Sequence, residues 1–130
     1  MDLPDSLVTL LEQPALCYLA TTMPKGSPQL TLTWVDTDGE HVIINSVQTH
    51  QKVRNIQRDP RVAVAISDPK KPGFFYQVRG RVLEVRTEGA VDHIEKLSQK
   101  YNGGPYPWYG GRDQVRVMLI IEPEHISTPR

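Results

Sequence analysis

The sequence predicts a mainly β domain, a largely antiparallel and closed or nearly closed β-barrel with short helices at its periphery. Three observations favour this fold class. Six segments have the composition of strands, and turn residues separate them at short intervals. A strong hairpin signal occurs early, at Asp38–Gly39. Strands and helices do not alternate over lengths that would build a parallel, doubly wound sheet, so antiparallel closure is expected.

In the first half of the chain we expect one helix followed by three strands. Four leucines at helical spacing predict a helix over residues 5–12, with Asp5 or Ser6 as its N-cap. An apolar run, an alternating segment that includes Trp34 and the returning arm of the hairpin predict strands at residues 15–22, 29–37 and 40–46.

In the second half the hydrophobic period changes twice. We expect a short helix that begins at an N-cap Thr49 and ends before Pro60, since the residue before proline avoids helical angles. The glycine at position 80 suggests a bulge within its strand. The further strands are expected at residues 61–67, 74–86 and 114–126, with a helix from residue 88 to 101 and an irregular loop over 102–111.

Length and composition bound the function. The chain of 130 residues suits a single domain over residues 1–130. Its 15 Lys and Arg balance its 15 Asp and Glu, so it lacks the broad basic field of a nucleic-acid-binding protein. No apolar run approaches the ~20 residues that span a bilayer, the N-terminus lacks signal-peptide features, and a lone Cys17 forms no internal disulfide. A cytoplasmic protein without nucleic-acid or membrane partners is expected.

A basic cluster follows the hairpin, in the segment that starts at His50. The start of a helix leaves backbone N–H groups unpaired, and these donors together with the helix dipole favour an anion. Lys52 lies in the first turn, where a cation opposes the dipole unless an anion lies between them. The cluster therefore suggests a phosphate site. The alternative is a solvated helix face whose arginines pair with Asp59 or Glu40.

A second candidate feature is a loop rich in glycine and proline that holds Tyr106, Trp108 and Tyr109, directly after Tyr101. Such aromatic side chains cover a flat ligand, or they form a structural lid over the end of the barrel. The sequence has no metal-ligand spacing, so no metal site is expected, and it has no glycine-rich nucleotide motif and no paired acid and base. The chemistry of an enzyme with these features would come from a bound cofactor; a binding protein without chemistry fits equally well.

Several segments in order, among them "LATT", "GSPQ", "WVDTDG", "KVRNIQRDPRV", "VRGRV" and "RVMLIIEP", resemble the pyridoxamine-5′-phosphate-oxidase-like split-barrel family. The sequence is most similar to the branch of flavin/deazaflavin oxidoreductases that use coenzyme F420. This resemblance covers nearly the whole chain. It implies a six-stranded, FMN-binding-like split β-barrel and a homodimer with its cofactor sites at the interface.

The resemblance also implies a set of cofactor-binding residues. The segment that holds the coenzyme phosphate matches Thr49, His50, Gln51, Lys52 and Arg54. The coenzyme ring would lie against Leu32, Thr33, Trp34, Asn45 and Ser46. The partner chain would contribute Tyr76, Val78 and Arg79, and Trp108 would act as a lid.

The implied reaction is hydride transfer between the deazaflavin and an unsaturated or quinone-like small molecule, with Tyr76 or Tyr106 as a possible proton donor. An FMN-dependent oxidoreductase of the same fold and a non-enzymatic F420- or flavin-binding protein are the alternatives. Oxidation of pyridoxamine phosphate itself is not expected, because those oxidases carry more basic residues for the substrate phosphate and a longer C-terminal segment.

Overall fold

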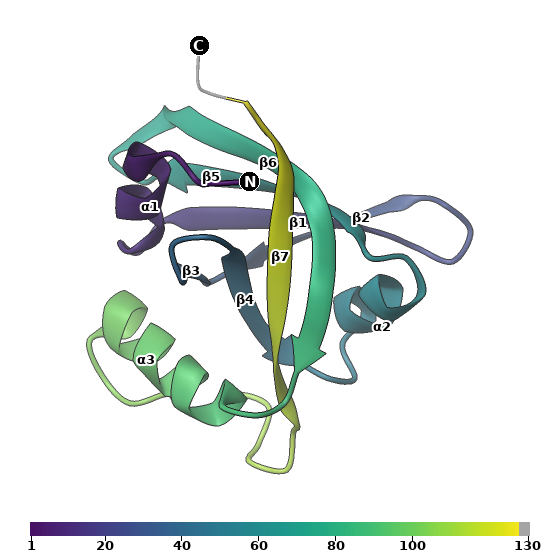
Figure 1. Cartoon of the computed structure of the whole chain (residues 1–130). Coiled ribbons are helices and arrows are strands. Elements are labelled where there is room, and N and C mark those ends of the chain that lie inside the picture. Colours follow the sequence, from purple (N-terminus) through teal and green to yellow (C-terminus); the bar gives the residue numbers. More distant parts are fainter. Residues whose placement is uncertain (128–130) are drawn as a thin grey trace.

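Seven strands form one curled antiparallel sheet with three short helices around it in the computed structural model, which describes residues 1–127 (Figure 1). The order of strands in the sheet is β2-β1-β5-β6-β7-β4-β3, and every pairing is antiparallel. The predicted mainly β, antiparallel barrel class is confirmed. The elements are α1 (Asp5–Leu11), β1 (Leu16–Thr22), β2 (Pro28–Thr33), β3 (Val35–Thr37), β4 (Val42–Val47), α2 (Gln51–Arg58), β5 (Arg61–Asp68), β6 (Lys71–Arg86), α3 (Ala90–Asn102) and β7 (Arg116–Ser127).

The sheet closes through a change of partner at Trp34. The prediction of one strand over residues 29–37, and with it the count of six strands, is wrong, because the chain there forms β2 and β3. Thr33 is the last residue of β2 to pair with β1, whereas Val35 already pairs with β4. Since β2 and β3 are the two ends of the strand order, the single residue between them joins both edges of the sheet.

The same change of partner leaves the barrel partly open. β3 pairs with β4 only as far as Ile44. β4 continues to Val47, and beyond Ile44 it pairs only with β7. The edge of β4 from residue 45 to 47 therefore faces a gap, and β2 lies on the other side of that gap. The functional site described below lies in this opening.

Apolar side chains from the helices and the strands fill the interior of the barrel. α1 and α2 lie near the two ends of β1 in Figure 1, and both contribute apolar side chains to one cluster. α3 instead covers the outer face of β4 and β7, where Ala90 packs against Ile43, Met118 and Ile120. Burial of each large apolar side chain contributes about 1.5–3 kcal/mol. The fully buried ones include Leu7, Leu11, Leu19, Ile44, Ile66, Leu119 and Ile121.

The helix starts differ from the predicted caps. His50, in an extended conformation, is the N-cap residue of α2, and no side chain caps the helix, so Thr49 is not the cap. The N-cap residue of α1 is Pro4, and Ser6 instead makes a hydrogen bond of 2.5 Å to the Tyr76 hydroxyl. Both helices are held mainly by packing of their apolar faces.

The predicted bulge at Gly80 is confirmed by a shift of register between Arg79 and Gly80 in the pairing of β6 with β7. A Cβ atom at position 80 would lie 2.0 Å from the backbone oxygen of Glu122, so only glycine allows the two strands to approach this closely. Within residues 1–127, no helix is both long and apolar enough to cross a membrane.

Candidate functional site

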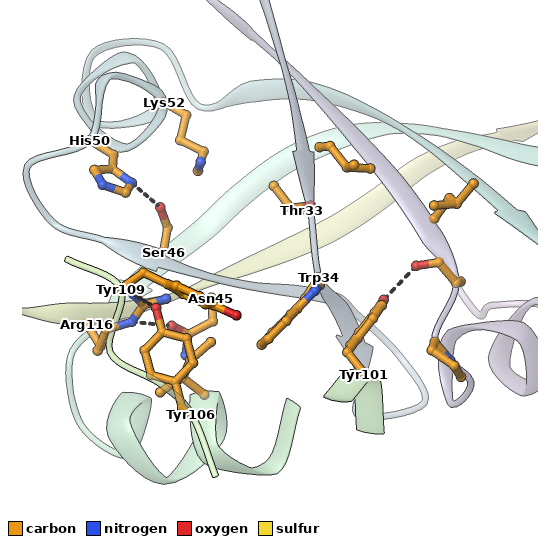
Figure 2. A pocket seen from close by; sticks show the side chains of 15 residues that line it. Thr33, Trp34, Asn45, Ser46, His50, Lys52, Tyr101, Tyr106, Tyr109 and Arg116 are labelled. Atoms are coloured by element: carbon orange, nitrogen blue, oxygen red, sulfur yellow. Dashed lines mark hydrogen bonds between the residues drawn. The ribbon is translucent and has the colours of Figure 1, made fainter. Parts of the chain in front are cut away.

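A cavity of about 460 Å³ occupies the opening between β2 and β4 (Figure 2). It is lined by the end of β2, the end of β4, the start of α2, one face of α3 and the loop that follows α3. The lining residues are Pro14, Ala15, Leu16, Leu32, Thr33, Trp34, Asn45, Ser46, His50, Lys52, Ile94, Tyr101, Tyr106, Tyr109 and Arg116.

One end of the cavity is cationic. Lys52 lines it and has no hydrogen-bond or ion-pair partner within residues 1–127, and His50 lies beside it, with Nδ1 3.5 Å from the Ser46 hydroxyl. Burial and then the charge of Arg116 lower the pKa of Lys52. Burial and then the charges of Lys52 and Arg116 lower the pKa of His50. None of the lining residues is acidic, so this end of the cavity favours an anion.

The start of α2 adds backbone donors to this end. The His50 amide donates to the Val47 carbonyl oxygen, and the Val53 amide donates to the His50 carbonyl oxygen. In the part of the chain that the structure describes, the amides of Gln51 and Lys52 have no such partner. Two unpaired N–H groups at a helix start are the usual backbone contribution to an anion site.

Arg116 is a second cation in the cavity wall, and it is only 8% exposed. Its Nε donates to Asn45 Oδ1 at 2.9 Å, and its Nη1 donates to the Tyr106 hydroxyl oxygen at 3.2 Å. Burial lowers the pKa of Arg116, and no carboxylate of residues 1–127 forms an ion pair with it. Its orientation is therefore set by neutral side chains.

A buried polar network holds Asn45 in place. Its Nδ2 donates to the Ala90 carbonyl oxygen at 2.9 Å and lies 3.0 Å from His93 Nδ1. Because Arg116 can only donate and a carbonyl can only accept, Asn45 presents its NH₂ group to His93. His93 Nδ1 thus accepts, and Nε2–H donates to Asp36 Oδ2 at 3.1 Å. The network runs without a break from Asp36 to the cavity wall.

Asp36 is the buried carboxylate at the far end of this network. Burial by itself would raise its pKa, but the hydrogen bonds from His93, from the Thr37 amide and from Lys96 outweigh this and hold the pKa well below its usual range. Lys96 Nζ lies 3.1 Å from the carboxylate oxygen Oδ2 that His93 also contacts. The carboxylate is thus ionised and fixes the orientation of His93.

The other end of the cavity is aromatic. Trp34 stacks on Tyr101, with ring centroids 5.1 Å apart and planes 7° apart, and Tyr106 meets Trp34 edge-on at 6.3 Å. The Tyr101 hydroxyl accepts from the Val35 amide at 3.1 Å and donates to the Ala15 carbonyl oxygen at 2.7 Å. Burial raises the pKa of Tyr101 to about 12. Tyr101 is therefore a structural support for Trp34 rather than a proton donor.

The loop after α3 brings the remaining aromatic side chains to the cavity. The Glu95 carboxylate accepts from the Tyr106 amide at 2.8 Å and from Trp108 Nε1 at 3.2 Å, which ties the loop to α3. Tyr106 meets Trp108 edge-on at 5.4 Å and Tyr109 edge-on at 5.7 Å. Tyr106 and Tyr109 line the cavity, whereas Trp108 contacts Tyr106 but does not line it.

Most of the side chains predicted for the ring and the phosphate lie in this one cavity. The lining includes Leu32, Thr33, Trp34, Asn45, Ser46, His50, Lys52 and, of the two predicted proton donors, Tyr106. Three other predicted residues of the α2 region do not line it. Thr49 and Arg54 are exposed, and the Gln51 side chain bonds with Asn55 and Arg54.

The three residues predicted to reach a partner's cofactor differ in position. Tyr76 and Val78 are buried in the core of their own chain, and the Tyr76 hydroxyl is bonded to Ser6. Their side chains therefore present no surface to another molecule, and Tyr76 does not reach the cavity as a proton donor. Arg79 is exposed.

Sequence reasoning missed Arg116 and the network behind it. A signal existed, because Arg116 is a lone charge directly before the apolar run "VMLII". A charge at that place in a strand indicates either an edge or a covered polar site. Nothing in the spacing of Asn45, His93 and Asp36 indicated that they would meet, since the contact depends on α3 packing across β3 and β4.

The sequence matches the profile of the pyridoxamine 5′-phosphate oxidase family over residues 3–128. The chain belongs to that family. No curated protein matches it significantly in sequence. The solved structures similar to it include one called F420 reductase, with 32% identity, a TM-score of 0.83 and coverage of 96% of this chain and 98% of the other.

Two further structures share the fold at lower identity. HupZ from Group A Streptococcus has 24% identity and a TM-score of 0.69, with 98% of both chains covered. A conserved hypothetical protein from Mycobacterium tuberculosis has 22% identity and a TM-score of 0.76, with 98% of this chain and 84% of the other covered.

The fold of this family binds flavin-type cofactors, and the cavity residues fit such a group. A flavin-type cofactor joins a flat, tricyclic ring to a phosphate. The cavity offers Trp34 and Tyr106 at one end and Lys52, His50 and the unpaired α2 amides at the other. The open edges of β2 and β4 offer backbone donors and acceptors for the polar edge of the ring.

The substitution Asp36→Asn tests the buried network. We expect it to lower the free energy of unfolding by about 1–3 kcal/mol at pH 7, because His93 and Lys96 lose a charged acceptor. The folded-state pKa of Asp36 lies below its unfolded value of about 3.9, so this stabilisation is present above pH 4 and is lost as the pH falls further.

Urea denaturation at pH 7 and at pH 3 measures this difference between the native protein and the variant. Glu84→Gln is the control, because Glu84 is an exposed carboxylate paired with Arg86 and its loss should change stability little. An Asp36→Asn protein as stable as the native one at pH 7 would contradict the role given to the carboxylate.

Proposed function

We propose that this protein is a coenzyme F420-dependent oxidoreductase that transfers hydride between the deazaflavin and an unsaturated or quinone-like small molecule. The observation that carries the proposal is the cavity itself, which joins an unpaired cationic end to an aromatic end at an open strand edge. The F420 reductase with 32% identity over 96% of this chain supports the choice of coenzyme.

The cationic end would hold the coenzyme phosphate. Lys52 and His50 supply side-chain donors, and Gln51 and Lys52 supply backbone amides. Thr49 and Arg54, which do not line the cavity, would act only on its rim. A phosphate would compensate the charge of Lys52, whose pKa is lowered first by burial and then by the charge of Arg116. Binding of the phosphate at this end would hold the distant ring in position for the reaction.

The other end would hold the ring. Leu32 and Thr33 at the end of β2 and Asn45 at the end of β4 border the opening from its two sides, and Trp34 closes it at the point where the chain changes partner. Trp34 is held by its stack on Tyr101, so it would present a fixed surface to the ligand. A wall that does not rearrange lowers the cost of ordering the complex.

The bound coenzyme would supply the hydride, and the chain would orient the substrate and deliver a proton. Tyr106 would donate this proton, because its hydroxyl oxygen accepts from Arg116, and its own O–H, which has no acceptor within residues 1–127, could donate into the cavity. The guanidinium also lies next to the oxygen that becomes negative once the proton leaves. The cavity residues Ile94 and Tyr109 would exclude water from the ring.

Two alternatives use the same cavity. An FMN-dependent enzyme needs the same ring and phosphate contacts. A binding protein without a substrate needs no acid or base, and the hydroxyl of Tyr106 in the cavity wall would then have no part in a reaction. Both are therefore outcomes of the experiment below.

Titration with F420 and with FMN, followed by a turnover assay, tests the function. We expect F420 to bind at least tenfold more tightly than FMN. We expect reduced F420 to be oxidised when enones, quinones or tetrapyrroles are added with the protein and not without it. Tighter binding of FMN would indicate the flavin enzyme, binding without consumption would indicate a binding protein, and no binding of either would end the proposal.

The variant Lys52→Ala should weaken F420 binding by about 1.5–3 kcal/mol, since a charged hydrogen bond to the phosphate is lost. This corresponds to a rise of roughly 10–150-fold in Kd. Arg86→Ala is the control for the loss of one positive charge, because Arg86 is exposed, pairs with Glu84 and does not line the cavity. Equal affinity of both variants for F420 would contradict the phosphate assignment.

We also propose that the protein is a homodimer. Tyr18, Leu30 and Leu32 form an apolar patch on the outer face of β1 and β2, where they are 40%, 65% and 58% exposed. Leu32 belongs both to this patch and to the cavity, so a second copy on the patch would complete the cavity. By the strand register, Arg79 lies on the same face and would then reach the partner.

Leu30→Glu should convert the dimer to a monomer, because a carboxylate would be buried within the apolar patch. Light scattering after size-exclusion chromatography measures the mass directly. Val91→Glu is the matched control: Val91 is also exposed, at 48%, but lies on α3, away from the patch. A native protein that elutes as a monomer, or an unchanged mass for Leu30→Glu, would refute the proposed interface.

A further inference from the structure

We propose that Arg116 selects the substrate by binding a carboxylate carried on a flat, conjugated acceptor. The inference deepens the function proposed above and rests on it for the reaction, although the binding of the carboxylate can be measured without that reaction. Arg116 belongs to none of the segments that the sequence predicted to hold the coenzyme.

Arg116 has the bonding capacity for this role. A guanidinium has five N–H donors. In residues 1–127, Arg116 uses one at Nε for Asn45 and one at Nη1 for Tyr106. Three N–H donors are left on a side chain that is 8% exposed and lines the cavity. A carboxylate can accept two parallel hydrogen bonds from such a group, and it would supply the countercharge that the cavity wall lacks.

The position of Arg116 separates it from the proposed phosphate site. Asn45 and Ser46 are consecutive residues of β4, so their side chains point to opposite faces of the sheet. Ser46 contacts His50 on the side of α2, and Asn45 contacts Arg116 on the side of α3. Figure 2 shows Lys52 and Arg116 on the two sides of this strand. Arg116 is thus placed for a second anionic group.

The surroundings of Arg116 define what carries the carboxylate. The guanidinium carbon lies 5.2 Å from the centroid of the Tyr106 ring, and that ring meets Trp34 edge-on at 6.3 Å. The carboxylate would therefore sit beside aromatic surfaces, which favour a flat, conjugated group. An α,β-unsaturated carboxylic acid has this shape and is a substrate for hydride addition.

The arrangement also provides a donor for the proton that the reduction of the substrate requires. The C=C bond of the acid would gain a hydride from the reduced coenzyme on its β carbon and a proton from Tyr106 on its α carbon, and solvent would return a proton to the Tyr106 oxygen. Two electrons leave the coenzyme and two enter the substrate. Arg116 would thus bind the carboxylate while bonded to the residue that donates the proton.

The buried network gives Arg116 a fixed orientation before the ligand arrives. Asn45 is held by Ala90 and His93, and His93 is held by Asp36. A guanidinium that is already in place loses little freedom when it binds a planar partner. Lysine in its place would keep the charge but lose the paired donors.

The experiment compares cinnamate with its neutral amide, cinnamamide, which has the same shape without the charge. Calorimetry and tryptophan fluorescence measure their binding to the coenzyme-free protein and to the protein loaded with oxidised F420. We expect the native protein to prefer cinnamate at least tenfold. Arg116→Gln should reduce the preference to less than twofold and Arg116→Lys to an intermediate value, whereas Arg86→Ala should leave it unchanged.

Either of two results would overturn the proposal. The first is that the native protein does not prefer cinnamate to cinnamamide, and the second is that Arg116→Gln keeps the native preference for cinnamate. If Arg116→Gln does not fold, as judged by its thermal melt, an unchanged preference in Arg116→Lys overturns it instead. If Arg116→Gln weakens F420 more than FMN, Arg116 binds the carboxylate tail of the coenzyme; if it weakens both as Lys52→Ala does, it binds the phosphate. Either result refutes a role in substrate selection.

The two proposals can fail separately. A protein that prefers cinnamate through Arg116 but binds neither F420 nor FMN would keep this inference and lose the proposed function. A protein that binds and oxidises reduced F420 but treats cinnamate and cinnamamide alike would keep the function and lose the role of Arg116.

Discussion

The structure depends on the exchange of hydrogen-bonding partners at Trp34. Up to Thr33 the backbone pairs with β1, and from Val35 it pairs with β4. One residue therefore joins the two edges of the sheet, and because β3 is shorter than β4, the closure is incomplete. The unpaired strand edges, the aromatic wall and the entrance to the cavity all follow from this point in the chain. Tyr101 secures it, since its hydroxyl bonds to Val35 and its ring supports Trp34.

The cavity also concentrates uncompensated charge. Arg116 is buried and Lys52 is partly buried, no acidic residue of the described chain lines the cavity, and burial lowers the pKa of each. The free-energy cost of burying unpaired charges is typical of sites where a bound ligand supplies the opposite charge. The rest of the cavity is largely neutral and aromatic. Different elements of the fold therefore supply the side chains that would bind an anionic group and those that would contact a ring.

Much of the fold could be predicted from local patterns, because strand alternation, the Asp38–Gly39 hairpin and the bulge at Gly80 are encoded over a few residues. The break at Trp34 could not, since a strand that changes partner keeps its alternation. For the site, the α2 region and the strand ends were found through the basic cluster and the resemblance to the family. Arg116 and its network were missed because they depend on the packing of α3 across residues far apart in sequence.

Asn45 connects the cavity to the docking of α3. The same amide group bonds to Ala90 and His93 on the helix and to Arg116 in the cavity wall. Detachment of α3 from the barrel would remove the contacts that hold Asn45, so a state with α3 detached would bind a ligand at Arg116 more weakly. By linkage, a ligand bound at Arg116 would in turn stabilise α3 on the sheet, and the helix and the binding site would then behave as one cooperative unit.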